Sequence, residues 1–192
     1  EDMNMKRTAG LFFIIIALVT FVAACGTNGE DEVTTGSGAN SNSGTDSQES
    51  DELIIEHELG ETPVKRHPDK VVVFDFGILD SLDQLGVEVS GVAKDSLPSY
   101  LSKYEADPYE NIGSLKEPDF EKIAEIGPDL IIISDRQSDL YDQLTDIAPT
   151  IHMGVDPTNY LDSFKHHMTI LGEIFGKQSD VEAELATIDE AI

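Results

Sequence analysis

Residues 118–137, PDFEKIAEIGPDLIIISDRQ, decide the fold class of this chain. Asp119 precedes a segment whose apolar residues recur at helical spacing, so we expect a helix there with Asp119 as its N-cap. Gly127 and Pro128 end that helix. The next residues, 130–133, are all apolar, which is typical of a parallel strand buried on both faces. A helix, a short turn and a buried strand in this order indicate an α/β protein.

The same alternation continues on both sides of this stretch. The expected strands are residues 53–55, 71–74, 87–92, 111–113, 130–133 and 150–155. The expected helices are residues 78–85, 120–126, 140–147, 160–175 and 179–192. Ser179 or Asp180 is expected to cap the last helix. Strands that alternate with helices predict a mostly parallel sheet flanked by helices.

Candidate ligand-binding residues follow the expected strands, because open α/β sheets bind ligands at the carboxyl ends of their strands. Three basic residues lie there, Lys94, Lys116 and Arg136. Residues 57–192 hold 28 acidic and 10 basic residues, a net charge of -18. A group of cations at one edge would oppose this negative charge and favour an anionic ligand. Arg136, directly after an apolar strand, is the strongest candidate, whereas Lys116 could equally be an ordinary loop lysine.

The composition excludes several function classes. The chain has 192 residues, with 38 acidic and 12 basic, and a formal charge of -26, which disfavours binding to nucleic acid. A single cysteine excludes an intramolecular disulfide and a multi-cysteine zinc site. The five histidines show no metal-ligand spacing, so surface or half-buried positions are expected for them. No phosphate-binding glycine motif or nucleophile elbow is present, and we expect no enzyme activity, no cofactor and no resident metal.

The N-terminus has the features of an export signal. Basic residues Lys6 and Arg7 precede an apolar run, residues 11–22, and small residues precede Cys25. The apolar stretch from residue 11 to 24 has 14 residues, fewer than the roughly 20 that a spanning helix needs. The motif Val-Ala-Ala-Cys resembles the lipobox of bacterial lipoproteins, which implies that Cys25 is diacylated and becomes the mature N-terminus.

This signal and the segment that follows it define the expected organisation of the chain. We expect a lipoprotein signal peptide over residues 1–24 and a lipid-anchored flexible linker over residues 25–52. The linker is rich in Gly, Ser, Thr, Asn, Asp and Glu, and it cannot bury a core. It would hold the folded part near the outer face of the cell membrane while leaving it free to move.

The folded part resembles a known family of transport proteins. The segments HELGETPVKRHPDKVVVFDFGILDSLDQLGV, NIGSLKEPDFEKIAEIGPDLIIISDRQ and IAPTIHMGV resemble the iron–siderophore solute-binding proteins of ABC importers. The DRQ and LPSYL segments resemble the branch that binds petrobactin and other catecholate siderophores. The resemblance covers residues 53–192.

This resemblance implies an architecture and partners. Family members have two α/β lobes joined by a long helix, with the ligand in the cleft between them. Residues 53–178 would then be the N-terminal siderophore-binding lobe and residues 179–192 the start of the interlobe helix, with the second lobe absent from this chain. The implied cargo is a ferric siderophore of the catecholate type, delivered by a monomeric lipoprotein to a membrane permease and its ATPase.

The resemblance also assigns roles to individual residues. The residues expected to contact the ligand are Arg136 as the main one, assisted by Lys94, Lys116 and Gln137. Asp135 departs from the pattern of this branch, in which a small residue usually precedes the arginine, and its charge partly offsets that of Arg136. Glu121 matches the surface glutamate that docks on the permease, although a carboxylate in the first turn of a helix also stabilises that helix by itself.

Three other function classes stay open on the sequence alone. The chain could be a structural or adhesive surface lipoprotein, which would need no cluster of bases at the strand ends. It could bind another metal chelate, such as haem or cobalamin. It could be a small lipid-anchored hydrolase or transferase, which turnover assays would distinguish from a binding protein.

Overall fold

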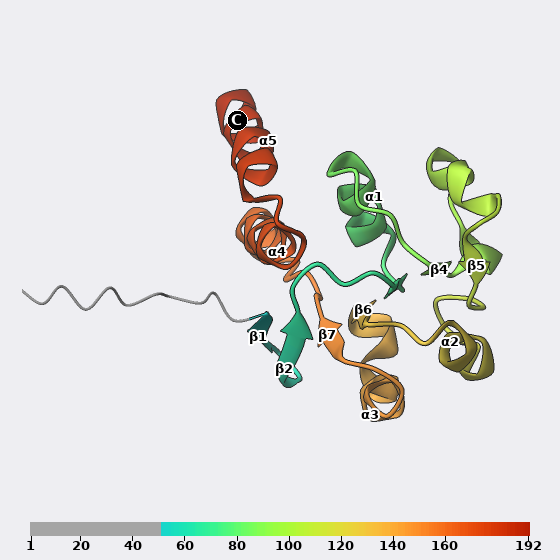
Figure 1. Ribbon diagram of the computed structural model, residues 1–192. Coiled ribbons are helices and arrows are strands. Elements are labelled where there is room, and N and C mark those ends of the chain that lie inside the picture. The colour runs from blue at the N-terminus through green and yellow to red at the C-terminus, as the bar shows by residue number, and fades with distance from the viewer. Residues whose placement is uncertain (1–50) are drawn as a thin grey trace, which may run out of the picture. The chain divides into compact units, whose positions relative to one another are not determined.

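The computed structural model describes residues 51–192, and they form an α/β unit around a five-stranded parallel sheet (Figure 1). The strand order is β5-β4-β3-β6-β7, with every neighbouring pair parallel. The strands are β3 Val71–Val73, β4 Gly91–Val92, β5 Glu110–Asn111, β6 Leu130–Ile133 and β7 Thr150–His152. The predicted α/β fold with a mostly parallel sheet is confirmed. The predicted signal peptide, Cys25 and nearly all of the predicted linker lie outside the described residues.

Helices cover both faces of this sheet (Figure 1). One face packs against α1 Phe76–Gln84, α4 Tyr160–Phe175 and α5 Gln178–Ala191, and the other against α2 Phe120–Ile126 and α3 Tyr141–Thr145. Successive strand residues alternate between these two cores, as the period of a strand requires, with Val71 and Val73 in the first core and Val72 in the second. Burial on both faces explains why the central strands are continuous apolar runs.

A β-hairpin precedes the parallel sheet, and the sequence predicts only half of it. It consists of β1 Glu52–His57 and β2 Gly60–Lys65, paired antiparallel. The sequence indicates a strand near residue 53 but not its partner, because β2 contains Pro63, which normally argues against a strand. The hairpin is tied to the sheet by the Thr62 hydroxyl, which donates to the Thr150 carbonyl at 2.8 Å. This contact sets the turn of the hairpin beside β7.

Several predicted elements are shorter than expected, or begin differently. The predicted strand 87–92 is reduced to β4, because the Val87 N–H still bonds the Leu82 carbonyl at the end of α1. The predicted strand 150–155 ends at residue 152. Three short 3₁₀ helices, η1 Lys94–Ser96, η2 Ser99–Glu105 and η3 Asp135–Leu140, were not predicted.

Of the two helix N-caps predicted from the sequence, one is confirmed and the other is wrong. The Asp119 carboxylate accepts from the Lys122 backbone N–H at 2.9 Å, so the predicted N-cap of α2 is confirmed. The predicted cap of the last helix is wrong. Helix α5 begins at Gln178 after Lys177, and no side chain caps it. In the part of the chain that the structure describes, no helix has the length and apolar character needed to cross a membrane.

Candidate anion-binding site

A buried glutamine organises the turn that follows β6. Gln137 is fully buried, and its side-chain oxygen accepts from the Ser134 backbone N–H at 3.2 Å. The other end of its amide donates to the Leu115 carbonyl. Gln137 therefore joins the turn that carries Arg136 to the loop that carries Lys116.

The loop of residues 113–118 has a defined conformation of its own. Gly113 lies at φ +88°, and a Cβ atom there would approach the Glu117 carbonyl oxygen to 2.4 Å, so only glycine fits. The Ser114 hydroxyl accepts from the backbone N–H groups of Lys116 at 3.2 Å and Glu117 at 3.0 Å. These bonds hold the loop in a tight turn with Lys116 near its tip.

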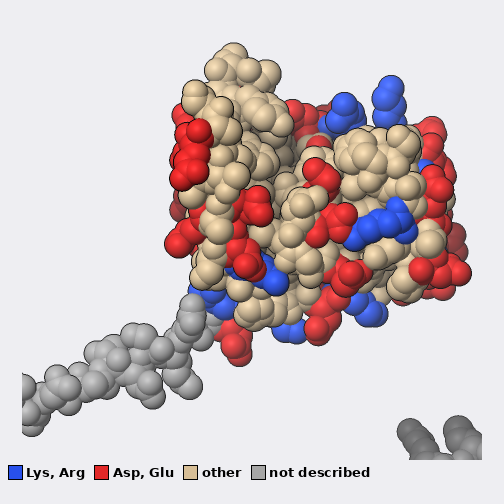
Figure 2. Space-filling model, turned by 90° about the horizontal axis from the view of Figure 1, so that it is seen from above, with Lys and Arg blue, Asp and Glu red and all other residues tan. Residues whose placement is uncertain are grey.

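Most cations in the described part of the chain are already bonded. The acidic groups that pair with lysines are Asp69 with Lys65, Asp83 with Lys103, Glu110 and Glu125 with Lys122, Asp189 with Lys165 and Asp180 with Lys177. The cations that bond backbone carbonyls are Arg66, Lys70 and Lys94. Figure 2 shows the excess of acidic side chains on one face, with basic side chains between them.

Two cations differ from the rest. Of the lysines and arginines within residues 51–192, only Lys116 and Arg136 have a charged group without a hydrogen bond or ion pair. Both residues are exposed, and both follow strands at the carboxyl edge of the sheet. In a protein with so many carboxylates, two unpaired cations on linked segments form a candidate site for an anion.

The other two predicted ligand residues have bonds within the protein. The Lys94 ammonium group donates to the carbonyls of Glu105 at 3.0 Å and Ala106 at 3.3 Å, at the end of η2. The Asn111 side-chain oxygen accepts from the backbone N–H groups of Lys94 and Gly113. Lys94 and Gln137 therefore lie in the framework of the site, and direct ligand contact by either of them stays a prediction.

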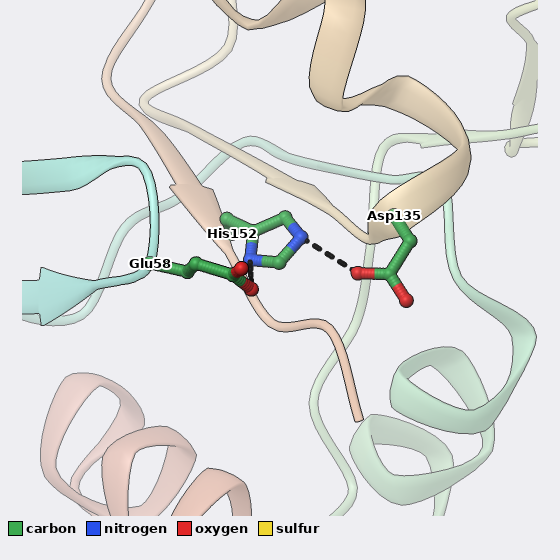
Figure 3. A group of neighbouring side chains, drawn as sticks. All are labelled: Glu58, Asp135 and His152. Atoms are coloured by element: carbon green, nitrogen blue, oxygen red, sulfur yellow. Dashed lines mark hydrogen bonds and ion pairs between the residues drawn. The ribbon is translucent and has the colours of Figure 1, made fainter. Parts of the chain in front are cut away.

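A histidine that the sequence did not single out lies beside this site (Figure 3). His152, at the end of β7, has a side chain only 3% exposed, and its Nε2 atom lies 3.0 Å from Oδ1 of Asp135. Its Nδ1 atom lies 4.0 Å from a carboxylate oxygen of Glu58, in the turn of the β1–β2 hairpin. These contacts link Asp135 through His152 to Glu58, and we call them the bridge. The sequence does not reveal this bridge, because the return strand of the hairpin was not predicted. The position of His152 at a strand end was the available signal.

These three side chains could hold a divalent cation by distance alone. One ligand atom from each of Glu58, Asp135 and His152 lies within 4.8 Å of the others. However, the two carboxylates approach different nitrogens of the ring (Figure 3), and a metal ion can bind only one of these nitrogens. The arrangement therefore fits an imidazole that lies between two carboxylates, hydrogen-bonded to Asp135 and 4.0 Å from Glu58, better than a metal centre.

A polar cavity of about 600 Å³ adjoins the bridge. Glu58 and Asp135 line one part of it, and His166 and His167 of α4 line another. His167 is buried, and no bonding partner for its Nδ1 atom lies within residues 51–192. Burial is the main cause that lowers the pKa of His167, and His166 and His152 lower it further. The neutral imidazole is therefore favoured at this position.

Glu121 lies apart from these groups, in the first turn of α2. Its side chain is exposed and makes no bond within residues 51–192. The neighbouring Lys122 instead pairs with Glu110 and Glu125. Glu121 is thus available to a partner, which agrees with its predicted docking role without testing it.

Comparison with known proteins identifies the family. The family model described as periplasmic binding protein matches residues 71–192, more than half of the chain. The chain belongs to the periplasmic binding protein family. Members of this family bind solutes, so the chain is not an enzyme, as its sequence predicts.

Two relatives in this family carry names that bear on the ligand. The petrobactin-binding protein YclQ of Bacillus subtilis is 45% identical over 98% of this chain and 57% of its own length. Its crystal structure superposes with a TM-score of 0.72 at 51% identity, over 73% of this chain and 51% of that one. The catecholate-siderophore binding protein VctP of Vibrio cholerae gives a TM-score of 0.68 at 41% identity, over 72% of this chain and 50% of that one.

A third relative bears on location. The putative ABC transporter substrate-binding lipoprotein YhfQ of Bacillus subtilis is 32% identical over 98% of this chain and 55% of its own length. The chain therefore spans about half the length of the relatives that it matches. The predicted resemblance to siderophore-binding proteins is confirmed at the level of the family.

Proposed function

We propose that this chain is the N-terminal lobe of the substrate-binding lipoprotein of an ABC importer, and that it captures a ferric siderophore of the catecholate type. The observation that carries the proposal is the pair of unpaired cations, Arg136 and Lys116, on linked segments at the carboxyl edge of the sheet. The names of the relatives YclQ and VctP support the catecholate class. A second lobe would follow α5 and supply the other side of the cleft.

The chemistry of the ligand suits these two residues. A ferric bis- or tris-catecholate complex carries about two to three negative charges around flat apolar rings, so its site needs fixed cations. The planar guanidinium of Arg136 can bond two catecholate oxygens at once and stack on a ring. Lys116 would add a mobile point charge beside it. Iron would enter only within the siderophore.

Titration with ferric petrobactin, followed by quenching of tyrosine fluorescence, tests this function. The full-length protein, with the proposed second lobe, should bind, and Arg136→Ala in that protein should weaken binding by about tenfold or more, since a charged hydrogen bond contributes roughly 1.5–3 kcal/mol. Lys177→Ala is the matched control, because that lysine is already paired with Asp180. Equal affinities for Arg136→Ala and Lys177→Ala would contradict the assignment. Haem and cobalamin, titrated in parallel, distinguish the other chelate classes.

The membrane anchor is a separate proposal, and it rests on the sequence and on the lipoprotein relative. Two acyl chains on Cys25 are enough for stable attachment to the outer face of the membrane. Cys25→Ser should therefore give an uncleaved or soluble product. Mature Cys25→Ser protein in the membrane fraction would contradict the anchor without affecting the binding function.

A further inference from the structure

Asp135 and Arg136 are neighbours in the sequence, and both side chains are exposed. A carboxylate that turns toward a neighbouring guanidinium group offsets its charge and repels an anionic ligand. The structure has a different arrangement. The Asp135 carboxylate bonds His152 at 3.0 Å (Figure 3). The Arg136 guanidinium has no partner within residues 51–192.

The position of His152 is set by the fold. The ring lies at the end of β7, with only 3% of its side chain exposed, so it has little freedom to move. The hairpin places a second carboxylate, that of Glu58, 4.0 Å from the other ring nitrogen. Three separate segments of the fold, β7, the hairpin turn and η3, therefore converge on one imidazole.

Gly154 provides the space that this bridge requires. A Cβ atom at position 154 would lie 2.2 Å from Oδ1 of Asp135 and 2.5 Å from Cε1 of His152. No side chain can occupy that position while the Asp135–His152 bond is intact. Glycine at residue 154 is therefore a second observation, independent of the hydrogen bond, that is consistent with the Asp135 carboxylate lying against His152.

We propose that His152 is a positioning residue of the anion site, which holds the Asp135 carboxylate and so leaves the Arg136 guanidinium free for an anionic ligand. The inference rests on the proposed function. It adds an explanation of how Asp135 can stand next to Arg136 without neutralising the charge that binds the ligand. Without the imidazole, the Asp135 carboxylate is free to turn to the guanidinium of the adjacent Arg136.

Four variants of the full-length protein, with the proposed second lobe, test this inference by titration with ferric petrobactin. His152→Leu removes the donor and should weaken binding by about tenfold, the effect of losing one charged contact. His152→Gln keeps an N–H donor and should retain most of the affinity. Asp135→Asn removes the competing charge and should bind at least as tightly as the unaltered chain. In the double variant, Asp135→Asn should restore most of the binding that His152→Leu loses.

The double variant separates positioning from a purely structural role. If His152 only stabilised the fold, His152→Leu would weaken binding by the same factor with and without Asp135→Asn, and that result would overturn the proposal. Unchanged binding by His152→Leu would overturn it as well. If His152→Leu does not fold, as judged by its melting curve, Asp135→Asn decides alone, and tenfold weaker binding by that variant rejects the inference.

The same titrations distinguish this inference from the proposed function. Absence of binding by the unaltered full-length protein, with the proposed second lobe, would reject the function. Binding that needs Arg136 but ignores both His152→Leu and Asp135→Asn would leave the function standing and reject only the positioning role. The protein is treated with EDTA, and the chelator is removed before ferric petrobactin is added, so that no divalent cation bound by Glu58, Asp135 and His152 can replace the hydrogen bond.

Discussion

Gln137 donates to the Leu115 carbonyl, and by this bond a residue of the β6 turn fixes a loop 22 positions earlier in the chain. The same amide accepts from the Ser134 backbone N–H at 3.2 Å, so both of its ends are used. Arg136 and Lys116, the two unpaired cations, are each adjacent in sequence to a residue of this bond. The relative placement of the proposed binding residues therefore depends on a side chain that is fully buried.

Replacement of Gln137 by alanine should affect both stability and binding. The Ser134 N–H and the Leu115 carbonyl lose their partner, which should lower the free energy of unfolding by about 1–3 kcal/mol in urea titrations. Binding of ferric petrobactin should weaken too, because the two loops are no longer joined. Gln143→Ala, at an exposed position of α3, is the control and should change neither quantity. Equal stability of the two variants would show that the buried amide does not hold the loops.

Substitution by alanine should affect ligand binding at Lys116 and protein stability at Lys94. Lys116 makes no side-chain bond within residues 51–192, so Lys116→Ala should leave the melting temperature unchanged and weaken ligand binding by about tenfold. The Lys94 ammonium group holds two carbonyls at the end of η2, so Lys94→Ala should lower stability by about 1 kcal/mol. Calorimetry measures both melting temperature and affinity. A Lys116→Ala variant that melts earlier but binds normally would reverse this assignment.

The sequence predicts the sheet, its flanking helices and both unpaired cations, for physical reasons that can be named. The run at residues 130–133 is apolar on both faces because helices cover both faces, and ligand residues follow such strands. That position selects Arg136, Lys116 and Lys94 alike, and the resemblance to the family adds weight to Arg136.

What the sequence does not predict is which partner each polar group selects. Lys94 and Lys116 both follow strands, and only the loop geometry decides that Lys94 bonds carbonyls while Lys116 stays free within residues 51–192. The bridge from Asp135 through His152 to Glu58 joins segments distant in the chain, and Pro63 conceals the strand that brings Glu58 there. Long-range side-chain contacts of this kind have no local sequence signature.

Acid should destabilise the protein, and His167 should be one cause. Burial lowers the pKa of His167 below the ordinary 6.5, and burial together with His152 lowers that of His57. Below about pH 6.5 the unfolded chain therefore binds more protons at these two positions than the folded one. The stability that the two histidines contribute is present at neutral pH and falls as the pH drops through this range.

Replacement of His167 should reduce this dependence on pH. Melting temperatures at about pH 7.5 and pH 5.5 should differ less for His167→Leu than for the unaltered chain, since one proton-binding site of the unfolded state is gone. His166→Gln should reduce the dependence less, because that neighbouring side chain is exposed and is only a secondary cause of the lowered pKa of His167. If His167→Leu keeps the full acid sensitivity, other groups must cause it.

Replacement of Glu121 should reduce transport without affecting siderophore binding. Its carboxylate is exposed in the first turn of α2, beside the N-cap Asp119, and is unbonded within residues 51–192. If it docks on a basic pocket of the permease, Glu121→Ala should leave siderophore binding unchanged while uptake of radiolabelled iron falls. The remaining negative charge of the protein still attracts a basic surface at long range, so the loss should be largest at high salt, where screening removes that attraction. Glu182→Ala on α5 is the control for the removal of one exposed acid.

A carboxylate in a first turn also stabilises its helix, by about 0.3–1 kcal/mol. A variant that melts slightly earlier, but supports full uptake in cells at every ionic strength, would leave only this stabilising role for Glu121.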